Sequence, residues 1–362
     1  MRILILTNKD VGLYKFRKEL LEEFRDNGFE VYASLPDGEF VKNIEDLGCK
    51  VIKTELNRRG TNPLEDIKLF NTYKSLVKSI KPDVVLTYTI KPNVYGGIVC
   101  RQNNIPYIAN VTGLGTALEN KGVLQLLTKH MYKAGIKKAE KVFFQNQDNL
   151  NFMINNHIIS GNYDLIPGSG VNLKQYEYHE YPNDDVLHFV FAGRMMAEKG
   201  FGEYLEAAEY IHNKYPNTKF HICGIKEEDY YAKVEELVEK GICVYHGLVD
   251  NMKEIYDQVH CTVLPTYYPE GMSNVLLESL ACGRPIITTD RPGCKEIVED
   301  GVNGFVVKAK DSKDVIEKIE KFINLSNEER KQLGLNGRNK VEKQFDRRIV
   351  IDKYMQEINK YL

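Results

Sequence analysis

The sequence lacks any apolar run long enough to cross a membrane, since no stretch of 18 consecutive apolar residues occurs among its 362 residues. Its first ten residues, MRILILTNKD, hold a short apolar stretch followed by polar residues. This pattern predicts a first β-strand rather than a signal peptide. We therefore expect a cytoplasmic protein without a transmembrane helix.

Motifs of metal, redox and nicotinamide chemistry are also missing. The seven cysteines are scattered without a CxxC pair, which is typical of reduced thiols packed in cores. No HExxH or DxD motif occurs, so we expect neither a protein-bound metal nor another cofactor. The absence of GxGxxG argues against a nicotinamide dehydrogenase.

Charge is nearly balanced overall, at −2, but not along the chain. Residues 1–175 hold 24 basic and 18 acidic residues, or +6, whereas the remainder holds 25 and 33, or −8. The basic half includes 128–141, TKHMYKAGIKKAEK, whose lysines recur at helical spacing. Such a helix could contact anionic lipid, although a solvated lysine face explains the pattern equally well. It lacks the series of interleaved aromatic residues that forms a platform for single-stranded nucleic acid, so we expect no nucleic-acid partner.

Apolar runs and helical patterns alternate along the whole chain, which indicates α/β units with parallel sheets covered on both faces. Expected strands lie at 2–7, 30–34, 50–53, 83–88, 106–109, 141–145, 187–192, 219–223, 242–246, 260–265 and 285–289. Expected helices lie at 14–27, 38–47, 63–80, 93–103, 121–138, 147–156, 200–214, 227–240, 251–258, 273–282, 311–322 and 339–362.

The length suits two domains, and the polar, proline-broken stretch at 172–185 predicts the linker between them. We expect Rossmann-like, doubly wound domains at 1–175 and 176–344 that face each other across a cleft. The last helix, over about 345–362, could cross back to the first domain, which periodicity alone does not decide.

Residues 270–278, EGMSNVLLE, carry two glutamates around the expected start of a helix that follows a buried strand. Ligands of doubly wound sheets lie at the carboxyl ends of strands, and the first helical turn offers free N–H groups to a phosphate. Glu278 lies inside the helix, where a carboxylate can accept hydrogen bonds from a diol, and Glu270 could meet a sugar hydroxyl. Spacing alone also fits two solvated surface glutamates.

Residues 191–200, FAGRMMAEKG, place Arg194 and Lys199 in the loop after another expected strand of the same sheet. A guanidinium fork and a mobile ammonium together can neutralise a diphosphate leaving group. The alternative is that both are solvated surface residues. This alternative is disfavoured because the Glu270 segment is expected on the same face of the same sheet.

Loops of the first domain are polar or glycine-rich where expected strands end. These loops are TYTIKPN (87–93), NVTGLGT (110–116) and FFQNQD (143–148), and they predict a polar acceptor cleft. The candidate cleft residues are Lys91, Asn110, Thr112, Gly113, Gly115 and Asn146. Asn146 fits equally well as the N-cap of the next helix.

The loop at 7–17, TNKDVGLYKFR, follows the first expected strand. Gly12 could let the backbone approach a ligand, and Arg17 is a possible anion contact. A plain turn glycine fits the pattern equally well.

Taken together and in order, these motifs resemble the retaining, GT-B-fold glycosyltransferases of family 4 over essentially the full length. EGMSNVLLE is similar to the family's Glu-x7-Glu motif and GRMMAEKG to its diphosphate loop, and PGSGVN (167–172) and ACGRPIITTD (281–290) also match. The segments YKFR, TIKPN, TGLG, FFQN and PGSGVN are similar to a narrower group. This group includes capsule and O-antigen transferases and an N-acetylgalactosaminyltransferase that extends undecaprenyl-diphosphate-linked diacetylbacillosamine.

The resemblance implies a donor site without a protein-bound metal. Arg194 and Lys199 are then the diphosphate ligands and, with Glu270 on the donor sugar, the catalytic residues. Glu278 is then the ribose ligand. The remaining implied donor contacts are Gly12, approaching from the other domain, Gly193, the uridine-base segment His246, Gly247, Leu248 and Val249, and the backbone of Gly271, Met272, Ser273 and Asn274.

On the acceptor side, the resemblance implies a polyprenyl-diphosphate-linked glycan at the inner face of the cell membrane, in bacterial surface-glycan biosynthesis. The basic first half and the 128–141 helix fit a peripheral association. Thr112 stands in a loop where many family members have a histidine. Whether any side chain of this protein replaces the catalytic part of that histidine is left open.

Two other functions remain as alternatives. A GT-B-fold UDP-sugar epimerase has the same donor site and would convert nucleotide sugar without an acceptor. A non-catalytic nucleotide-sugar-binding protein is disfavoured by the presence of Arg194, Lys199, Glu270 and Glu278 together.

Overall fold

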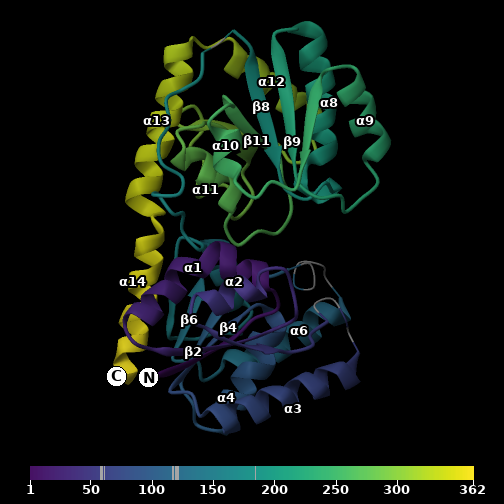
Figure 1. Ribbon diagram of the computed structural model, residues 1–362. Coiled ribbons are helices and arrows are strands. Elements are labelled where there is room, and N and C mark those ends of the chain that lie inside the picture. The colour runs from purple at the N-terminus through teal and green to yellow at the C-terminus, as the bar shows by residue number, and fades with distance from the viewer. Residues whose placement is uncertain (58–59, 61, 116–117, 119–121, 184) are drawn as a thin grey trace. The chain divides into compact units, whose positions relative to one another are not determined.

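The computed structural model describes the protein over residues 1–57, 60, 62–115, 118, 122–183 and 185–362. The chain forms two compact units, of which the second is Gly170–Arg347. The first unit joins Met1–Ser169 to the C-terminal residues Arg348–Leu362 (Figure 1). The C-terminal segment thus clusters with the first unit.

The boundaries between the units lie at 169/170 and 347/348, whereas the sequence placed them at 175/176 and 344/345. The reason is a backbone bridge between the two crossings of the chain. The Val171 N–H donates to the carbonyl of Phe345 at 2.9 Å, and the Arg347 N–H donates to the carbonyl of Val171 at 3.0 Å. The chain therefore enters and leaves the second unit at hydrogen-bonded, adjacent positions.

The first unit is built on a parallel sheet, which has seven strands among the described residues. Its order is β3-β2-β1-β4-β5-β6-β7, so the direction of winding reverses between β1 and β4. The strands are β1 (Arg2–Leu6), β2 (Glu30–Leu35), β3 (Lys50–Lys53), β4 (Val84–Tyr88), β5 (Tyr107–Val111), β6 (Lys141–Phe144) and β7 (Tyr163–Leu165).

Helices cover both faces of this sheet (Figure 1). They are α1 (Asp10–Asp26), α2 (Val41–Asp46), α3 (Pro63–Ile80), the π-helical turn η1 (Pro92–Gly96), α4 (Gly97–Gln102), α6 (Val123–Ile136), α7 (Gln147–Asn155), α14 (Arg347–Ile358) and the 3₁₀ turn η3 (Asn359–Tyr361). The predicted start of a helix at 121 lies outside the described residues.

Burial on both faces explains why the strands read as continuous apolar runs. In β1, Ile3 and Ile5 pack into a core with α1, α2 and α14, whereas Leu4 and Leu6 pack into a second core with α3, α4 and α6. Local signals set the helix ends: the Asn62 side chain accepts from the N–H of Leu64 at the start of α3, where Pro63 occupies the first turn.

The second unit repeats the plan with a parallel sheet that has six strands among the described residues, in the order β10-β9-β8-β11-β12-β13. Its strands are β8 (Leu187–Ala192), β9 (Thr218–Cys223), β10 (Cys243–Gly247), β11 (Cys261–Leu264), β12 (Ile286–Thr289) and β13 (Gly304–Val307). Its helices are the 3₁₀ turn η2 (Ala197–Lys199), α8 (Phe201–Lys214), α9 (Tyr231–Glu239), α10 (Met252–Tyr256), α11 (Asn274–Ala281), α12 (Ser312–Ile323) and α13 (Asn327–Gln344).

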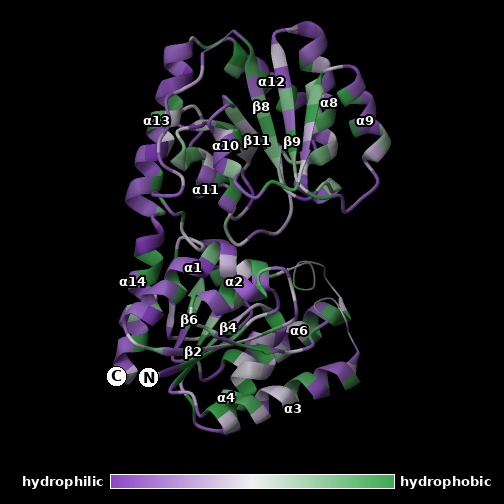
Figure 2. Cartoon of the chain, viewed as in Figure 1, coloured by the Kyte–Doolittle hydropathy of each residue, from purple (hydrophilic) through white to green (hydrophobic). Residues whose placement is uncertain are grey.

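The parallel α/β architecture confirms the predicted fold class. Figure 2 shows the strands mostly in hydrophobic colours and α13 mostly in hydrophilic ones. No helix among the described residues is sufficiently long and apolar to span a membrane.

Three parts of the predicted element list were wrong. The strands β7 and β13 were missed, because runs of three and four residues are too short to show a period. The predicted single helix at 339–362 is instead the end of α13 followed by α14. The helices are separated at Phe345, because the chain there makes the backbone bridge to Val171.

All seven cysteines are buried and free, in agreement with the expectation of packed core thiols. Burial raises the pKa of each thiol, for example to about 12 for Cys49 and Cys294. These thiols therefore stay protonated near neutral pH.

A row of histidines crosses the second sheet. His188 Nδ1 and His221 Nε2 lie 2.8 Å apart, and His221 Nδ1 lies 2.9 Å from His246 Nε2. His260, just before β11, accepts from the backbone N–H of His188 and donates to the carbonyl of Asn183. Burial lowers the pKa of His221 to about 3, helped by its two histidine neighbours, and burial lowers the pKa of His260 to about 4.

These pKa values predict a stability that decreases in mild acid. The unfolded chain takes up protons at histidine near pH 6.5, whereas folded His221 resists protonation until about pH 3, so folding free energy is lost as pH falls between these values. We expect His221→Gln to reduce the slope of unfolding free energy against pH by up to about 1.4 kcal/mol per pH unit. Urea unfolding between pH 7 and 4 measures this slope, with exposed His157→Gln as the control; equal slopes in parent and His221→Gln would contradict the assignment.

Candidate functional site

Two loops meet at the point where the winding of the second sheet reverses. β8 and β11 are neighbours in this sheet, although they are distant in sequence. The loop after β11 is tied to the loop after β8, because the Tyr267 N–H and the Thr266 hydroxyl both donate to the carbonyl of Glu198, at 2.8 and 3.2 Å. Such a reversal is where open α/β sheets bind ligands.

The first of these loops carries both predicted cations. Arg194 lies two residues after β8, and its Nη1 donates to Glu227 Oε2 at 2.9 Å. Lys199 ends η2 and forms an ion pair with Glu270, with side chains 13% and 18% exposed. The structure thus brings Arg194, Lys199 and Glu270 together, as the sequence predicted.

An aromatic ring lies beside both cations. The Tyr268 ring centroid is 5.0 Å from the guanidinium carbon of Arg194 and 5.1 Å from Lys199 Nζ. A ring face in contact with two cations restricts where their side chains can go and adds a cation–π attraction of about 0.5–1 kcal/mol each at half-exposed sites. The sequence analysis missed Tyr268 and Glu227; Tyr268 stands two residues before Glu270 and could have been noticed there.

Glycine lets the loops approach closely at this edge of the sheet. At Gly224, after β9, φ is +151°, and a Cβ would lie 1.7 Å from the carbonyl oxygen of Gly193. The Gly193 N–H donates to the Cys223 carbonyl at 2.8 Å, and the Gly224 N–H donates to the Gly247 carbonyl at 2.7 Å. The loops after β8, β9 and β10 are therefore held in contact, and a side chain at Gly224 cannot fit.

The segment that follows Glu270 is held by the loop after β12. The Ser273 N–H donates to the carbonyl of Gly293 at 2.9 Å, and a Cβ at Gly293 would lie 2.8 Å from that of Glu270. Gly271, Met272 and Ser273 are buried in this arrangement.

Ser273 is the N-cap residue of α11, and its side chain makes no capping bond to the first turn. The start of α11 can thus present backbone N–H groups and the positive end of its dipole to an anion. Asn274 is the first residue of that turn, as the sequence predicted.

Glu278 lies in the second turn of α11 and is half-buried. Burial and the neighbouring Glu278 carboxylate raise the pKa of Tyr176, with which Glu278 shares a hydrogen bond. The same carboxylate contributes to the raised pKa of buried Tyr256. Glu278 is thus half-buried and hydrogen-bonded to Tyr176 of its own unit rather than being a fully solvated surface glutamate.

The predicted base segment lies at the end of β10 and in the loop after it. His246 stacks on His221 with ring centroids 5.2 Å apart, and Leu248 is 63% exposed. Val249 packs against the core of the second unit. This segment adjoins the diphosphate loop through the Gly193–Gly224–Gly247 contacts.

The match at 281–290 contributes structure rather than a ligand contact. Arg284 is fully buried and donates to the carbonyls of Tyr256 at 2.7 Å, Glu180 at 2.9 Å and His179 at 3.1 Å. Its guanidinium therefore ties the chain entering the unit to α10.

In the first unit, the structure corrects part of the predicted acceptor cleft. Asn110 is 2% exposed, its amide donates to the Thr87 carbonyl at 3.1 Å, and it accepts from the Tyr354 hydroxyl. Asn110 is therefore part of the core, because α14 returns from the C-terminus to cover it. Asn146 is the N-cap of α7 and accepts from the N–H of Asn149 at 2.8 Å, which is the alternative that the sequence left open.

The other first-unit candidates lie at or near the sheet edge. Lys91 is paired with Asp66 at 2.6 Å, with side chains 13% and 19% exposed, so its charge is already balanced. Thr112, Gly113 and Gly115 follow β5, and residue 116 of the predicted loop lies outside the described residues.

Gly12 was predicted to lie in a loop, but it lies in the first turn of α1. A Cβ there would meet nothing within 4 Å, and the Arg17 guanidinium donates to its carbonyl at 2.9 Å. Its role toward a donor stays a prediction.

Among the residues that the structure describes, no group of three or more His, Cys, Asp or Glu side chains is arranged to hold a metal ion. The cationic groups of the site are instead Arg194 and Lys199. An anion such as a diphosphate is the ligand that this arrangement can bind.

Two parallel α/β units, one of which gathers Arg194 and Lys199 where its sheet reverses direction, are the architecture of the GT-B fold class. The second unit matches the family model "Glycosyl transferases group 1" over residues 179–340, and the first matches "Glycosyl transferase 4-like" over residues 2–146. Together these models span more than four fifths of the chain. The two matches together identify the chain as a glycosyltransferase, with a group 1 second unit and a 4-like first unit.

Individual relatives extend over the full length. The chain is 28% identical to the N,N'-diacetylbacillosaminyl-diphospho-undecaprenol alpha-1,3-N-acetylgalactosaminyltransferase of Campylobacter jejuni, covering 98% of this chain and 97% of that protein. It is 27% identical to the capsular polysaccharide biosynthesis glycosyltransferase CapM of Staphylococcus aureus, covering 99% and 96%. The crystal structure of Anabaena Alr3699/HepE in complex with UDP shares the fold, with a TM-score of 0.80 at 18% identity over 100% of both chains.

The Arg194–Glu227 pair predicts a measurable competition. Its side chains are 25% and 27% exposed, and the Glu227 carboxylate competes with an anionic ligand for the guanidinium. We expect Glu227→Gln to tighten binding of inorganic pyrophosphate about fivefold, which corresponds to about 1 kcal/mol for a partly exposed pair. Isothermal titration measures this change, and Glu209→Gln, which removes a carboxylate paired with Lys233 and Lys240 elsewhere, is the matched control. Unchanged or weaker binding in Glu227→Gln would show that Arg194 does not contact the anion.

Proposed function

We propose that the protein is a retaining glycosyltransferase that moves a hexose or N-acetylhexosamine from a UDP-sugar to a polyprenyl-diphosphate-linked glycan, in bacterial surface polysaccharide or glycan biosynthesis. The observation that carries the proposal is the gathering of Arg194, Lys199 and Glu270 at the reversal point of the second sheet. The UDP complex of HepE and the names of the two sequence relatives support the donor and acceptor classes.

In this proposal the donor diphosphate displaces Glu227 from Arg194. Lys199 and the first-turn N–H groups of α11 then also bind the diphosphate. The bond between the anomeric carbon and the diphosphate oxygen breaks, and the two cations stabilise the charge that develops on that oxygen. Because Arg194 and Lys199 already supply the compensating positive charge, the proposed transfer uses no protein-bound metal.

Glu270, released from Lys199 by the diphosphate, can accept hydrogen bonds from hydroxyl groups of the donor sugar. Glu278 accepts from the ribose, and the segment His246–Val249 lies beside the base. The acceptor hydroxyl attacks the anomeric carbon from the face that the diphosphate leaves and gives its proton to the departing phosphate oxygen. Attack on that face retains the anomeric configuration.

The proposal predicts strong effects of single changes at the donor site. We expect Lys199→Ala and Glu278→Ala each to lower transfer at least about tenfold, which is on the order of 1.4 kcal/mol in the barrier. The assay uses a panel of UDP-sugars with a polyprenyl-diphosphate-linked acceptor, and NMR of the product gives its anomeric configuration.

The exposed Glu239→Ala at the end of α9 is the control and should keep full activity. Near-normal transfer by both site variants would reject the assignment of Lys199 and Glu278. Conversion of a UDP-sugar without any acceptor would favour the epimerase alternative instead.

We also propose a peripheral association with the inner face of the cell membrane through α6. The first half of this helix exposes Val123, Leu124, Leu126 and Leu127, which are 50–85% exposed. Its second half and the residues after it expose Lys133, Lys137 and Lys138. Apolar side chains that can enter lipid, next to cations that can meet phosphates, fit an anionic membrane surface.

The structure narrows the lysine-rich stretch predicted at 128–141. Lys129 instead packs over the ring of Phe152, with Nζ 5.3 Å from the ring centroid. Lys141 lies on β6 and pairs with Glu357 at 3.4 Å. The outward face therefore holds fewer lysines than the sequence suggested, and an apolar patch that the sequence analysis did not use.

The apolar patch gives the membrane proposal a direct test. We expect the double change Leu126→Ser and Leu127→Ser to weaken binding to anionic vesicles at least about tenfold, because each leucine loses on the order of 1 kcal/mol of apolar burial. Vesicle sedimentation at low salt measures binding, and Leu362→Ser, at a C-terminal leucine that is even more exposed, is the control. Equal sedimentation of all three proteins would exclude α6 as the membrane contact.

A further inference from the structure

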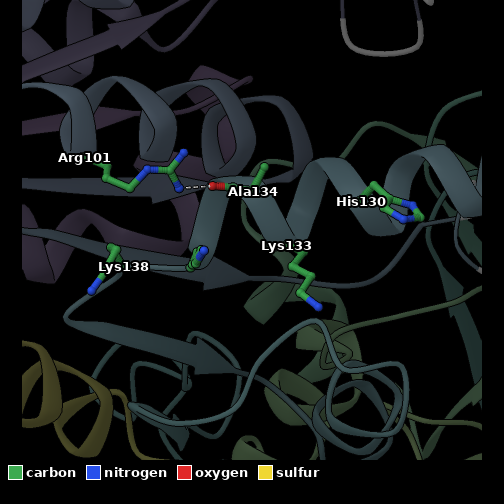
Figure 3. A pocket seen from close by; sticks show the side chains of 6 residues that line it. Arg101, His130, Lys133, Ala134 and Lys138 are labelled. Carbon is green, nitrogen blue, oxygen red and sulfur yellow. Dashed lines mark hydrogen bonds between the residues drawn. The ribbon is translucent and has the colours of Figure 1, made fainter.

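A pocket of about 480 Å³ opens between α4 and α6 of the first unit. The residues lining it are Arg101, His130, Lys133, Ala134, Lys137 and Lys138. Figure 3 shows Arg101 reaching from α4 to the backbone of α6, with the other side chains distributed along α6 and just beyond it. Four of the six lining residues are permanent cations, and the lining contains no carboxylate.

The positive charges of this basic pocket have no ion-pair partner in the described part of the chain. Among the residues that the structure describes, no carboxylate pairs with Arg101, Lys133, Lys137 or Lys138. Other lysines of the same unit are paired, since Lys91 meets Asp66 and Lys141 meets Glu357. Four unbalanced positive charges repel one another, and an anion bound among them relieves this repulsion.

The C-terminal end of α6 accounts for part of the charge without any ligand. Lys133 lies in the last turn and Lys137 at the C-cap, where the helix dipole favours cations. Arg101 does not belong to α6, however. Its Nη1 donates to the carbonyl of Ala134 at 2.5 Å, which fixes the guanidinium at the pocket and leaves its other N–H groups for a further acceptor.

His130 is oriented in the same way. Its Nδ1–H donates to the carbonyl of Leu126 at 2.8 Å, which orients the ring, so Nε2 accepts in the neutral ring and donates to an anion only when the ring is protonated. The pocket thus combines two oriented groups, Arg101 and His130, with mobile ammonium groups.

We propose that this basic pocket is a specific binding site for a phosphate group carrying two negative charges. The Arg101 fork would bind two phosphate oxygens, and the lysine ammoniums would bind the remaining charge. Such a group occurs on a lipid with a phosphomonoester headgroup and on free phosphate compounds. If the ligand is a lipid, this proposal rests on the proposed membrane association and specifies its headgroup. If the ligand is a free compound, the proposal is independent of that association.

Vesicle binding tests the lipid source. Vesicles containing phosphatidic acid, a phosphomonoester, are compared with vesicles containing phosphatidylglycerol, a phosphodiester, at matched total charge. We expect the protein to bind the phosphatidic acid vesicles at least about fivefold more tightly. Arg101→Lys keeps the charge but loses the fork, so it should remove this preference while leaving binding to phosphatidylglycerol unchanged.

Two further variants control for charge and folding. Lys129→Gln removes a charge from α6 outside the pocket and should keep the preference for phosphatidic acid. Lys137→Gln removes a pocket charge whose side chain has no hydrogen bond or ion pair among the described residues, so it tests the pocket even if Arg101→Lys is unstable. We expect Lys137→Gln to reduce the preference at least about threefold.

Solution binding tests the free source. Calorimetric titration with glycerol 3-phosphate is done in a Lys199→Ala background, which impairs the other anion site of the chain. One bound equivalent that Arg101→Lys weakens at least about fivefold would identify a free phosphate compound as the ligand. The site would be overturned if the vesicles showed no preference and no solution binding depended on Arg101.

The outcomes separate the two proposals. Vesicle binding without headgroup preference, together with no solution binding, would leave the membrane association standing and reject the basic pocket. Solution binding through Arg101, with no vesicle binding at all, would support the pocket and reject the membrane association.

Discussion

The candidate active site depends on how closely two backbones approach at the carboxyl edge of the second sheet. The carbonyl of Gly193 occupies the space where any side chain at position 224 would begin, so the loops after β8 and β9 can meet there. Their contact directs Arg194 toward Glu227, and the bonds from Thr266 and Tyr267 to Glu198 bring Glu270 to Lys199. Backbone contacts thus position the charged side chains before any ligand is present, which is the preorganisation that charge stabilisation requires.

The strands and the positions of the site loops could largely be predicted from the sequence, because strands of a parallel sheet buried on both faces appear as apolar runs. The carboxyl ends of those runs are where ligand loops must lie, so Arg194, Lys199, Glu270 and Glu278 could be placed on one edge without coordinates. What periodicity cannot reveal is which loop touches which. Glu227 and Tyr268 contact the cations through the packing of one loop on another, and no sequence spacing predicts these contacts.

The same limit explains the errors in the first unit. Asn110 looked like a cleft residue because it ends a strand, but Tyr354 reaches it from α14, 244 residues along the chain. Asn146 looked like a ligand residue and caps a helix. A polar residue at a strand end is satisfied either by a ligand or by a distant part of the chain, and this choice depends on how the C-terminus returns. Short strands such as β7 carry too little pattern to be detected at all.

The pairing of the site's cations also governs how an anionic ligand arrives. Arg194 with Glu227 and Lys199 with Glu270 each sum to zero charge, and residues 176–362 carry a net charge of −8. Beyond a screening distance of about 8–10 Å, a diphosphate therefore feels no attraction from the second unit. Capture then proceeds by random encounter followed by a local exchange of carboxylate for phosphate, rather than by long-range electrostatic steering. Because the net charge of this unit repels an anion, raising the ionic strength does not slow association, and selectivity for the donor arises in the bound state instead of during the approach.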